Sequence, residues 1–266
     1  MLTLIRGAGD LASGIALRLW RAGFDVVMTE IERPTTIRRT VAFSEAVLCG
    51  ETAVENVTAK RADSAGHARD LLADGVLPVL VDPTGACRAE LCPDALVDAI
   101  LAKRNTGTTM HDAPVVVGVG PGFTAGVDCH AVVETMRGHT LGRVIYDGAA
   151  LPNTNVPGLI GGFAGERVLR APADGFFEGT RRIGDTVAAG EVVGYVAGQP
   201  MRCTIGGVLR GLLADGVPVR KDMKAGDVDP RGEVSYCRTS SDKALAVGGG
   251  VLEAILCLAG GKRHGV

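Results

Sequence analysis

The sequence predicts an α/β protein of two domains, in which a parallel sheet with crossover helices is followed by a small all-β domain. Three observations lead to this prediction. Through about residue 150, short apolar runs alternate with amphipathic stretches of helical length, as β-α-β units do. Glycine density then rises, since nine of the 38 glycines fall in residues 1–110, eleven in 111–166 and eighteen in 167–266. After about residue 166 the sequence reads as short strands separated by glycine turns.

Each element of the first domain follows from the period of its apolar residues. Short apolar runs bounded by glycine, proline or aspartate predict strands, and apolar residues spaced three and four apart predict helices. The expected strands are 2–6, 25–28, 76–81 and 115–119, and the expected helices are 10–22, 64–73 and 94–104. Because strands joined through helices run parallel, this order predicts a Rossmann-like domain over residues 1–165, with ligands outside the carboxyl ends of its strands.

A glycine-rich turn joins the first strand to the first helix. Residues 7–14 read G-A-G-D-L-A-S-G, the G-x-G-x-x-A form of the dinucleotide-binding fingerprint. In that motif Gly7 allows the tight turn, Gly9 lets a pyrophosphate approach the main chain, and Ala12 lets the helix pack closely on the sheet. The helix N-terminus offers N–H groups to an anion, and Glu30 ends the second strand where an acid can bond a ribose hydroxyl. The turn therefore predicts a nucleotide or phosphate site.

Two features argue against a nicotinamide cofactor at this turn. Asp10 places a negative charge where a pyrophosphate would dock. The segment R-P-T-T-I-R-R-T, residues 33–40, offers arginines and threonines that could hold phosphate or another oxyanion. Use of NAD(P) therefore stays an alternative. The structural alternative is a glycine turn that only lets the helix pack, beside a solvated basic loop.

A second glycine loop, Gly118–Gly126, also follows an expected strand. If the residues after it form a helix, His130 and Glu134 lie one turn apart on the same face. A thiol at a helix N-terminus has a lowered pKa, which makes Cys129 a candidate nucleophile or soft-metal ligand. Asp128, His130 and Glu134 are the candidate catalytic residues, and His130 is also a candidate metal ligand. The alternative is structural, with Asp128 as an N-cap and an ordinary helix pair.

The second half contains an internal repeat. The pattern G-D-x-V-x-x-G-x-x-V over residues 184–194 has a near echo over residues 216–228, and each copy would form two short strands joined by glycine turns. This pattern is typical of the biotinyl/lipoyl-like, or barrel-sandwich hybrid, fold, which we expect over residues 166–236. A swinging-arm carrier needs a lysine on an exposed hairpin. Because residues 104–220 contain no lysine, neither biotin nor lipoyl attachment is predicted.

The end of the chain contributes two further expectations. Asp227 and Asp229 lie in a tight turn that closes the barrel and are candidate metal ligands, with a charged turn as the alternative. A last helix is expected in residues 237–266, starting at a serine cap. Gly248–Gly250 would weaken this helix unless a neighbour packs closely against it, and its face would then suit docking or a homo-oligomer.

Composition narrows the class of protein. The chain has 28 Lys plus Arg and 30 Asp plus Glu, a net charge of −2. It lacks the excess of positive charge that binding to nucleic acid or an anionic membrane usually requires. Seven cysteines without a Cys-x-x-Cys pair indicate reduced thiols. The longest apolar run, residues 244–260, is interrupted by Glu253 and is shorter than the ~20 residues of a membrane span. The sequence therefore predicts a cytoplasmic protein with no nucleic-acid or membrane partner.

Several segments together resemble one protein family. They are GAGDLASG, RPTTIRRTVAFSEAV, GPGFTAG, ETMRGHTLGRVI and GDVDPRGE, which begin at residues 7, 33, 120, 134 and 226. In these the chain is similar to the YqeB-like proteins of selenium-dependent molybdenum hydroxylase systems, and to maturation factors of xanthine and CO dehydrogenases, which carry a Rossmann-type domain. The resemblance implies a role in maturing the cofactor of a molybdenum hydroxylase, with that hydroxylase or other maturation proteins as partners.

Three functions remain open at this point. The first is an accessory protein that binds a nucleotide or a molybdopterin-type cofactor during its maturation or insertion. The second is a non-catalytic scaffold or chaperone that docks cofactor and hydroxylase, and the third is an NAD(P)-dependent oxidoreductase. The residues expected to bind the small anionic ligand are Gly7, Gly9, Asp10, Ala12, Gly14, Glu30, Thr35, Thr36, Arg38, Arg39, Gly120, Gly122 and Asn153.

Overall fold

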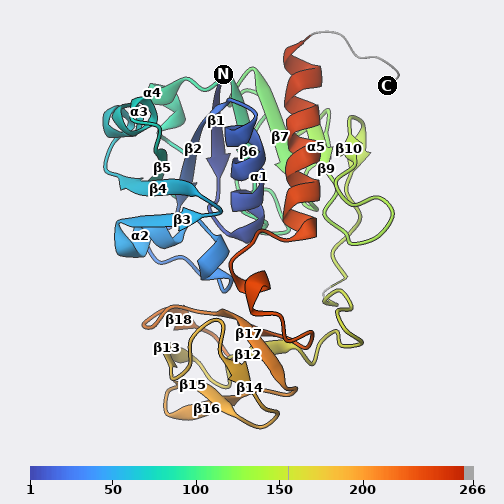
Figure 1. Cartoon of the computed structure of the whole chain (residues 1–266). Helices are drawn as coiled ribbons and strands as arrows, with labels where there is room; N and C mark the ends of the chain where they lie inside the picture. Colours follow the sequence, from blue (N-terminus) through green and yellow to red (C-terminus); the bar gives the residue numbers. More distant parts are fainter. Residues whose placement is uncertain (155, 261–266) are drawn as a thin grey trace. The chain divides into compact units, whose positions relative to one another are not determined.

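The computed structural model describes residues 1–154 and 156–260, which form two compact units (Figure 1). Unit 1 comprises residues 1–32, 42–153 and the chain from residue 240 onward. Unit 2 comprises residues 33–41 and 154–239. The segment 33–41, which we call the strap, therefore belongs with the second half of the chain, although the sequence places it in the first domain.

Unit 1 is built on a nine-stranded sheet in the described part of the chain. Seven neighbouring strands run parallel, and an antiparallel strand closes each edge. In spatial order the strands are β10 (Val144–Ile145), β9 (Ala131–Val133), β7 (Val115–Val119), β6 (Ala95–Asp98), β1 (Leu2–Arg6), β2 (Asp25–Glu30), β5 (Leu77–Val81), β4 (Val57–Ala62) and β3 (Glu51–Val54). A separate pair consists of β8 (Thr124–Ala125) and β11 (Gly148–Ala149).

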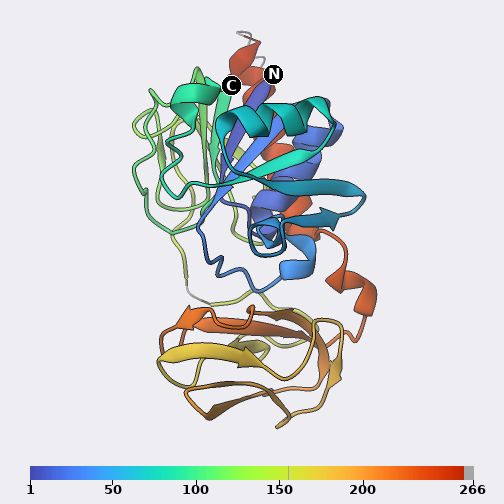
Figure 2. The ribbon, with the colours of Figure 1, turned by 90° about the vertical axis from the view of Figure 1, so that its left-hand side faces the viewer.

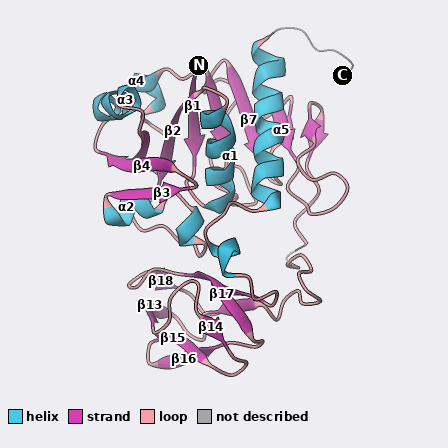
Figure 3. Cartoon of the chain, viewed as in Figure 1, coloured by secondary structure: helices cyan, strands magenta, loops and turns pink. Residues whose placement is uncertain are grey.

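This sheet corrects the expected Rossmann-like domain. The sheet is mixed, because β10 and β3 pair antiparallel with their neighbours. The helix expected over 94–104 is wrong, and the helix considered for 129–137 does not form, since these segments contain β6 and β9 followed by loops (Figure 3). Short apolar runs such as A-L-V suit a strand buried on both faces as well as one turn of a helix, so their period could not separate the two. The observed class is α/β with a large mixed sheet.

Helices cover both faces of this sheet. They are α1 (Asp10–Arg21), α2 (Glu45–Cys49), α3 (Ala65–Ala73), α4 (Arg88–Leu91) and α5 (Asp242–Ala259). Leu71 of α3 and Leu91 of α4 are buried in one cluster with Val132 of β9. A Cβ added at Gly250 of α5 would lie 2.9 Å from the side chain of Val133. Because successive strand residues point to opposite faces, α5 covers the face away from α3.

The three-glycine run Gly248–Gly250 lies inside α5 without breaking it. The helix continues for 18 residues, and α1 packs along it (Figure 2). A Cβ at Gly14 would lie 2.6 Å from the Cβ of Ala244, and one at Gly248 would lie 2.8 Å from the carbonyl of Gly14. These glycines therefore let two helices approach more closely than side chains allow, and their packing lies within unit 1.

Unit 2 consists of two four-stranded antiparallel sheets in the described residues. One sheet has the order β12 (Val168–Arg170), β19 (Lys224–Asp229), β17 (Gly207–Leu212), β14 (Thr186–Val187), and the other β16 (Gln199–Arg202), β15 (Val192–Val196), β13 (Gly175–Gly179), β18 (Pro218–Val219). Phe177, Val193, Leu209 and Val228 are fully buried in their common core. The biotinyl/lipoyl-like fold expected for this region is therefore replaced by a coarser description, a unit of two antiparallel sheets. Two short 3-10 helices complete the unit, η1 (Arg39–Val41) and η2 (Val234–Cys237).

In the part of the chain that the structure describes, no helix combines the length and the apolar character needed to cross a membrane.

Candidate functional site

The carboxyl ends of the parallel strands lie along one edge of the sheet in unit 1. Arg6, Glu30 and Asp98 are the last residues of β1, β2 and β6. The loops that follow these strands and β7 all begin at this edge, which we call the carboxyl edge. It includes both glycine loops, so the predicted ligand site falls here.

The first glycine loop is held by hydrogen bonds to Ala8. The N–H of Ala8 donates to Oε2 of Glu30 at 3.0 Å, and its carbonyl accepts from the N–H of Ser44 at 2.8 Å and the hydroxyl of Ser13 at 3.2 Å. Gly7 has a φ of +96°, in the left-handed region that favours glycine. The turn is therefore fixed by its own unit before any ligand binds.

The start of α1 has one feature that favours an anion site, a helix N-terminus without a side-chain cap, and one that opposes it, the carboxylate of Asp10. Gly9 occupies the N-cap position and brings no side-chain cap. Asp10, the first helical residue, accepts the N–H of Leu11 at 2.9 Å on its own carboxylate. This negative charge lies where an anion would gain from the helix dipole. Ala12 is buried, and like Gly14 it serves the packing of α1.

Glu30 ties the end of β2 to the glycine loop. Its second oxygen accepts the N–H of Ile31 at 2.8 Å. Burial raises the pKa of Glu30, and the N–H groups of Ile31 and Ala8 oppose that rise. Each carboxylate oxygen can accept a further hydrogen bond, so the ribose contact expected for Glu30 remains geometrically open.

The loop after β6, residues 99–104, is enclosed by both glycine loops. A Cβ at Gly7 would lie 2.8 Å from the carbonyl oxygen of Ala99, and one at Gly122 would lie 2.6 Å from the N atom of Arg104. Only glycine permits main chain to approach main chain so closely. Lys103 and Arg104 are exposed on this loop. Three loops of the carboxyl edge therefore form one continuous surface that presents two basic side chains.

The glycines of the second loop allow close packing against neighbouring side chains. Gly118 lies against the ring of Phe123, where a Cβ would be 2.5 Å away, and Gly120 lies against Thr135, with a Cβ 2.8 Å from Oγ1. Gly120 and Gly122 have φ values of +78° and +112°, so this loop cannot start a helix.

A buried chain of polar groups, which the sequence did not reveal, lies behind the carboxyl edge. Arg6, Asp98 and Thr108 are 4%, 1% and 1% exposed. Arg6 Nη1 lies 3.1 Å from Asp98 Oδ2 and 2.5 Å from Thr108 Oγ1, and that hydroxyl donates to Asp98 at 2.6 Å. Asn105 accepts the N–H of Thr108 at 2.8 Å and donates to Asp128 at 3.2 Å. These hydrogen-bonded side chains thus connect the end of β1 to the turn beyond the second glycine loop.

The predicted constellation of Asp128, His130 and Glu134 is not brought together. His130 and Glu134 flank strand β9, and four residues of strand span about 13 Å. Asp128 accepts the N–H of Thr124 at 2.8 Å, and His130 Nδ1 accepts the N–H of Val116 at 2.9 Å. Glu134 is 2% exposed and accepts three main-chain N–H groups. His130 and Glu134 therefore do not share a helix face, because the segment is an extended strand. The carboxylate of Glu134 binds main-chain N–H groups.

Burial raises the pKa of four thiols among the described residues, those of Cys87, Cys129, Cys203 and Cys237. Cys129 is fully buried, and burial raises its pKa to about 11, which corrects the expected lowering at a helix N-terminus. Burial and the neighbouring carboxylate of Asp82 raise the pKa of Cys87 to about 12. Among the described residues no group of three or more His, Cys, Asp or Glu side chains could hold a metal ion.

The predicted ligands in the strap belong to unit 2. Arg38 is buried and donates to the carbonyls of Tyr236 and Thr239 at 3.0 and 3.4 Å. Arg39 Nε donates to the carbonyl of Leu212 at 3.0 Å. Thr35 is exposed and Thr36 half-buried in the same strap, and Asn153 is exposed at the end of a unit 1 segment. The two arginines thus hold main-chain carbonyls of the β unit.

Asp227 and Asp229 are engaged in ion pairs. Both are 1% exposed. Asp227 pairs with Arg167 and, at 2.6 Å, with Arg210, which also lies 3.1 Å from Asp229. Arg231 pairs with Asp229 at 2.6 Å, and although burial opposes it, this pairing holds the pKa of Asp229 below its ordinary value. The carboxylates expected as metal ligands are held instead by three guanidinium groups.

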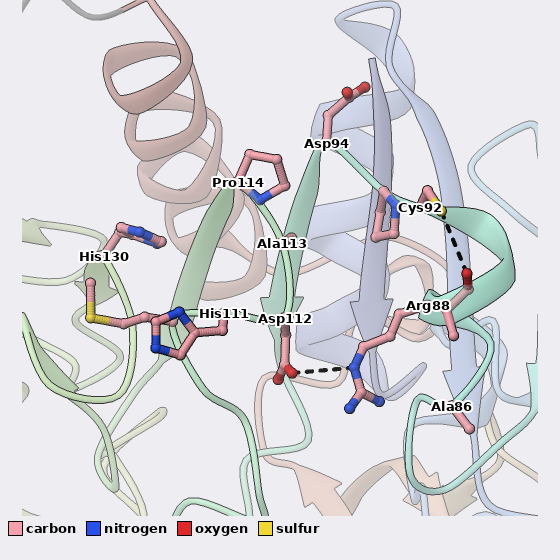
Figure 4. Close-up of a pocket in the computed structure, with 12 residues that line it drawn as sticks. Ala86, Arg88, Cys92, Asp94, His111, Asp112, Ala113, Pro114 and His130 are labelled. Atoms are coloured by element: carbon pink, nitrogen blue, oxygen red, sulfur yellow. Dashed lines mark hydrogen bonds and ion pairs between the residues drawn. The ribbon is translucent and has the colours of Figure 1, made fainter.

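A groove of about 1070 Å³ lies at the other end of the sheet in unit 1 (Figure 4). One wall is formed by residues 86–94, which contain α4, and the other by residues 110–114, which lead into β7. His130, a predicted site residue, also lines it. Its other ionisable lining residues are Arg88, Cys92, Asp94, His111 and Asp112, and the charged and imidazole side chains among them carried no signal in the sequence.

The site and fold define an α/β protein with a mixed sheet and a separate all-β unit. No protein-family model matches the sequence. The chain is 53% identical over 257 residues to the uncharacterized protein YqeB of Escherichia coli K12, covering 97% of this chain and 48% of the relative. It thus spans about half the length of the curated relative it matches.

Two solved structures resemble this chain only weakly. A succinylglutamate desuccinylase/aspartoacylase from Rhodobacter sphaeroides matches at 18% identity with a TM-score of 0.23, covering 55% of this chain and 64% of that one. An aspartoacylase family protein from Mesorhizobium loti matches at 14% identity with a TM-score of 0.26, covering 85% and 83%. These TM-scores are too low to carry an argument about fold or activity.

The comparisons correct the functions expected from the sequence. The matching relative is named only as an uncharacterized protein, and that name gives no link to molybdenum, selenium, cofactor insertion or a nicotinamide cofactor. Membership of a selenium-dependent molybdenum hydroxylase maturation family, a scaffold or chaperone role for such a hydroxylase, and NAD(P)-dependent oxidoreduction are therefore withdrawn.

Proposed function

We propose that unit 1 binds a small phosphate-bearing molecule, of the nucleotide or pterin-phosphate class, at its carboxyl edge. The observation that carries this proposal is the enclosure of residues 99–104 between two glycine loops. At Gly7 and Gly122 a Cβ would lie only 2.8 and 2.6 Å from main-chain atoms of that loop. The enclosed loop lies beside the positive end of α1 and has exposed residues at 100 and 102–104. Loops beside a helix N-terminus suit phosphate oxygens.

The charges on the same loop support a phosphate ligand. Lys103 and Arg104 are both exposed on the loop that the glycines enclose. Leu101 and Lys103 have φ values of +60° and +61°, which side chains rarely adopt. Strain of this kind persists where the surroundings impose it, and it is enriched at ligand sites. The buried pair of Arg6 and Asp98 holds the base of the loop, so the two basic side chains start from a fixed frame.

Titration calorimetry with adenosine 5′-monophosphate, a pterin phosphate and inorganic phosphate tests the proposal, with adenosine as the uncharged control. We expect at least one phosphate-bearing probe to bind and adenosine not to bind. The double variant Lys103→Gln/Arg104→Gln should weaken binding about tenfold, since hydrogen bonds to charged groups contribute about 1.5 kcal/mol or more.

The matched control is Lys60→Gln/Arg61→Gln, an adjacent Lys-Arg pair on β4 whose charge change is the same. It should bind the probe as the unmodified protein does. The proposal fails if no phosphate probe binds, or if the 103/104 variant binds as tightly as the control.

A further inference from the structure

Both ends of the strap lead directly to groups that hold the first glycine loop. The strap, residues 33–41, belongs to unit 2, and the chain on either side of it belongs to unit 1. Glu30 lies three residues before the strap, and Ser44 lies three residues after it. The N–H of Ala8 donates to Oε2 of Glu30 at 3.0 Å, and the carbonyl of Ala8 accepts the N–H of Ser44 at 2.8 Å. Ala8 is therefore bonded on both sides to chain that continues into the strap.

A further pair of hydrogen bonds strengthens the connection after the strap. The N–H of Phe43 donates to Oγ of Ser13 at 2.8 Å, and that hydroxyl donates to the carbonyl of Ala8 at 3.2 Å. All three residues are fully buried. Because a peptide group is planar, fixing the carbonyl of Ala8 also fixes the direction of the N–H of Gly9, the N-cap of α1. The groups that flank the strap thus orient a donor at the proposed phosphate site.

The middle of the strap is bonded to unit 2. The carbonyl of Ile37 accepts the N–H of Leu212 at 2.8 Å, and the hydroxyl of Thr40 donates to the carbonyl of Cys237 at 2.5 Å. The side chain of Ile37 also packs against the hydrophobic core of this unit. The strap is therefore fastened to unit 2 by a main-chain bond, a side-chain bond and an apolar contact.

We propose that the strap regulates the phosphate site of unit 1, according to how firmly unit 2 holds it. While the strap is bound to unit 2, the chain at both of its ends keeps Ala8 and the N–H of Gly9 in the orientation found in the structure. Release of the strap from unit 2 frees those ends, and the affinity for phosphate falls. This inference rests on the proposed function, because it concerns the affinity of the same site.

The regulation acts in both directions, because two linked equilibria change each other by the same factor. A phosphate-bearing ligand that prefers the fixed loop also stabilises the strap on unit 2. Coupling of this kind typically changes an affinity about 5- to 150-fold. The covalent chain supplies the connection, since the strap is continuous with unit 1 at residues 32 and 42.

The variant Thr40→Val tests the strap with little disturbance, because it removes one hydroxyl and keeps the shape of the side chain. Hydrogen exchange measured by NMR follows the amides of Ala8 and Ser44. We expect both amides to exchange about fivefold faster in the variant, as for the loss of one hydrogen bond. Thr180→Val is the matched control, since it removes a hydroxyl bond to a carbonyl elsewhere in unit 2. It should leave the exchange of both amides unchanged.

Ile37→Ala removes the apolar contact of the strap and should accelerate the same exchange about tenfold. Its control is Ile183→Ala, because Ile183 is also half-buried and packs on the core of unit 2 outside the strap. The control should lower the stability of unit 2 and leave the exchange at Ala8 unchanged. Equal acceleration by the two isoleucine variants overturns the proposal, and so does unchanged exchange at Ala8 in both Ile37→Ala and Thr40→Val.

Calorimetry with the phosphate-bearing probes distinguishes this inference from the proposed function. A probe that binds the unmodified protein should bind Ile37→Ala at least fivefold more weakly and Ile183→Ala with unchanged affinity. If the probe binds the two variants equally well, the phosphate site stands and its regulation by the strap is overturned. If no probe binds the unmodified protein, the proposed function and the regulation fail together.

Discussion

The two glycine loops of unit 1 look alike in sequence and differ in structure. Both follow a buried parallel strand, and both place glycines two residues apart. After the first loop the chain enters α1 directly, with Gly9 at a φ of −68°. In the second loop Gly120, Gly122 and Gly126 all have positive φ values, and the chain continues into short strands. A helix needs a run of right-handed residues, which only the first loop supplies.

The difference shows what each loop is for. In the first loop one glycine makes the turn, and hydrogen bonds to Ala8 hold it. In the second loop the glycines fill close contacts with Phe123, Thr135 and Arg104. Both loops approach the segment 99–104, so the second loop supports the surface that the first one completes. Glycine spacing alone therefore predicts a turn, and the residues that pack on it decide its role.

The largest effect is expected for the polar chain that joins the two loops. Replacing Asp98 by Asn leaves the buried guanidinium of Arg6 without a charged partner, and breaking a buried pair costs about 3–5 kcal/mol. Urea unfolding should show this loss of stability. Glu51→Gln, which removes an exposed pair with Lys60, should cost about 1 kcal/mol or less. Equal effects of the two substitutions would mean that the stability of the loops does not depend on these buried polar groups.

The next effect compares two glycines within the second loop. Gly122→Ala adds a Cβ 2.6 Å from main chain and also strains a φ of +112°, and we expect a loss of about 2–4 kcal/mol in unfolding free energy. Gly126 has a φ of +84° but no atom within 4 Å of its added Cβ. Gly126→Ala should therefore cost only the backbone strain, about 1 kcal/mol. If both cost the same, close packing is not what distinguishes this loop.

Much of the first loop could be predicted from sequence, because its information is local. The strand, the turn and the start of α1 lie within residues 2–21 and obey simple apolar periods. The last helix was also predicted, and Gly248 in it packs against a close neighbour, α1, as such a run of glycines requires. Such features depend on residues close in the chain or on one packing contact.

The polar chain and the extended form of 129–137 could not be predicted. Arg6 reaches Asp98 and Thr108 across 92 and 102 residues, and no local period marks such a contact. The segment around β9 has apolar residues at spacings that fit either a helix or a strand. It forms a strand because it pairs with β7 and β10. The strap was placed in the wrong half for the same reason, since its partners lie about 175 to 200 residues away.

Cys129 gives a smaller effect with a defined pH dependence. Its folded pKa of about 11 lies above the ordinary value of 9.0, so the folded state keeps the proton longer than the unfolded state. This contribution to stability is complete below pH 9 and is lost as the pH rises toward 11. By pH 10 the loss should be about 1 kcal/mol.

Urea unfolding at pH 8 and pH 10 measures that loss in the unmodified protein and in Cys129→Ala. The stability of the variant should fall less between the two pH values, because it lacks this thiol. A parallel fall in both proteins would show that the thiol of Cys129 is not held neutral by burial.

The smallest effect separates the two loops by their acidic residues. Asp10 lies at the positive end of α1, where an anion of the ligand would also lie. Asp10→Asn should strengthen phosphate binding two- to fivefold at low ionic strength, corresponding to about 0.3–1 kcal/mol for a charge at a helix terminus. Asp128→Asn, beyond the second loop, should leave that affinity unchanged, because Asp128 is bound to Thr124 and Asn105. Calorimetric titration of both variants gives the comparison. A loss of affinity in Asp10→Asn would mean that this carboxylate accepts a hydrogen bond from the ligand, so that the first loop recognises a hydroxyl rather than a phosphate.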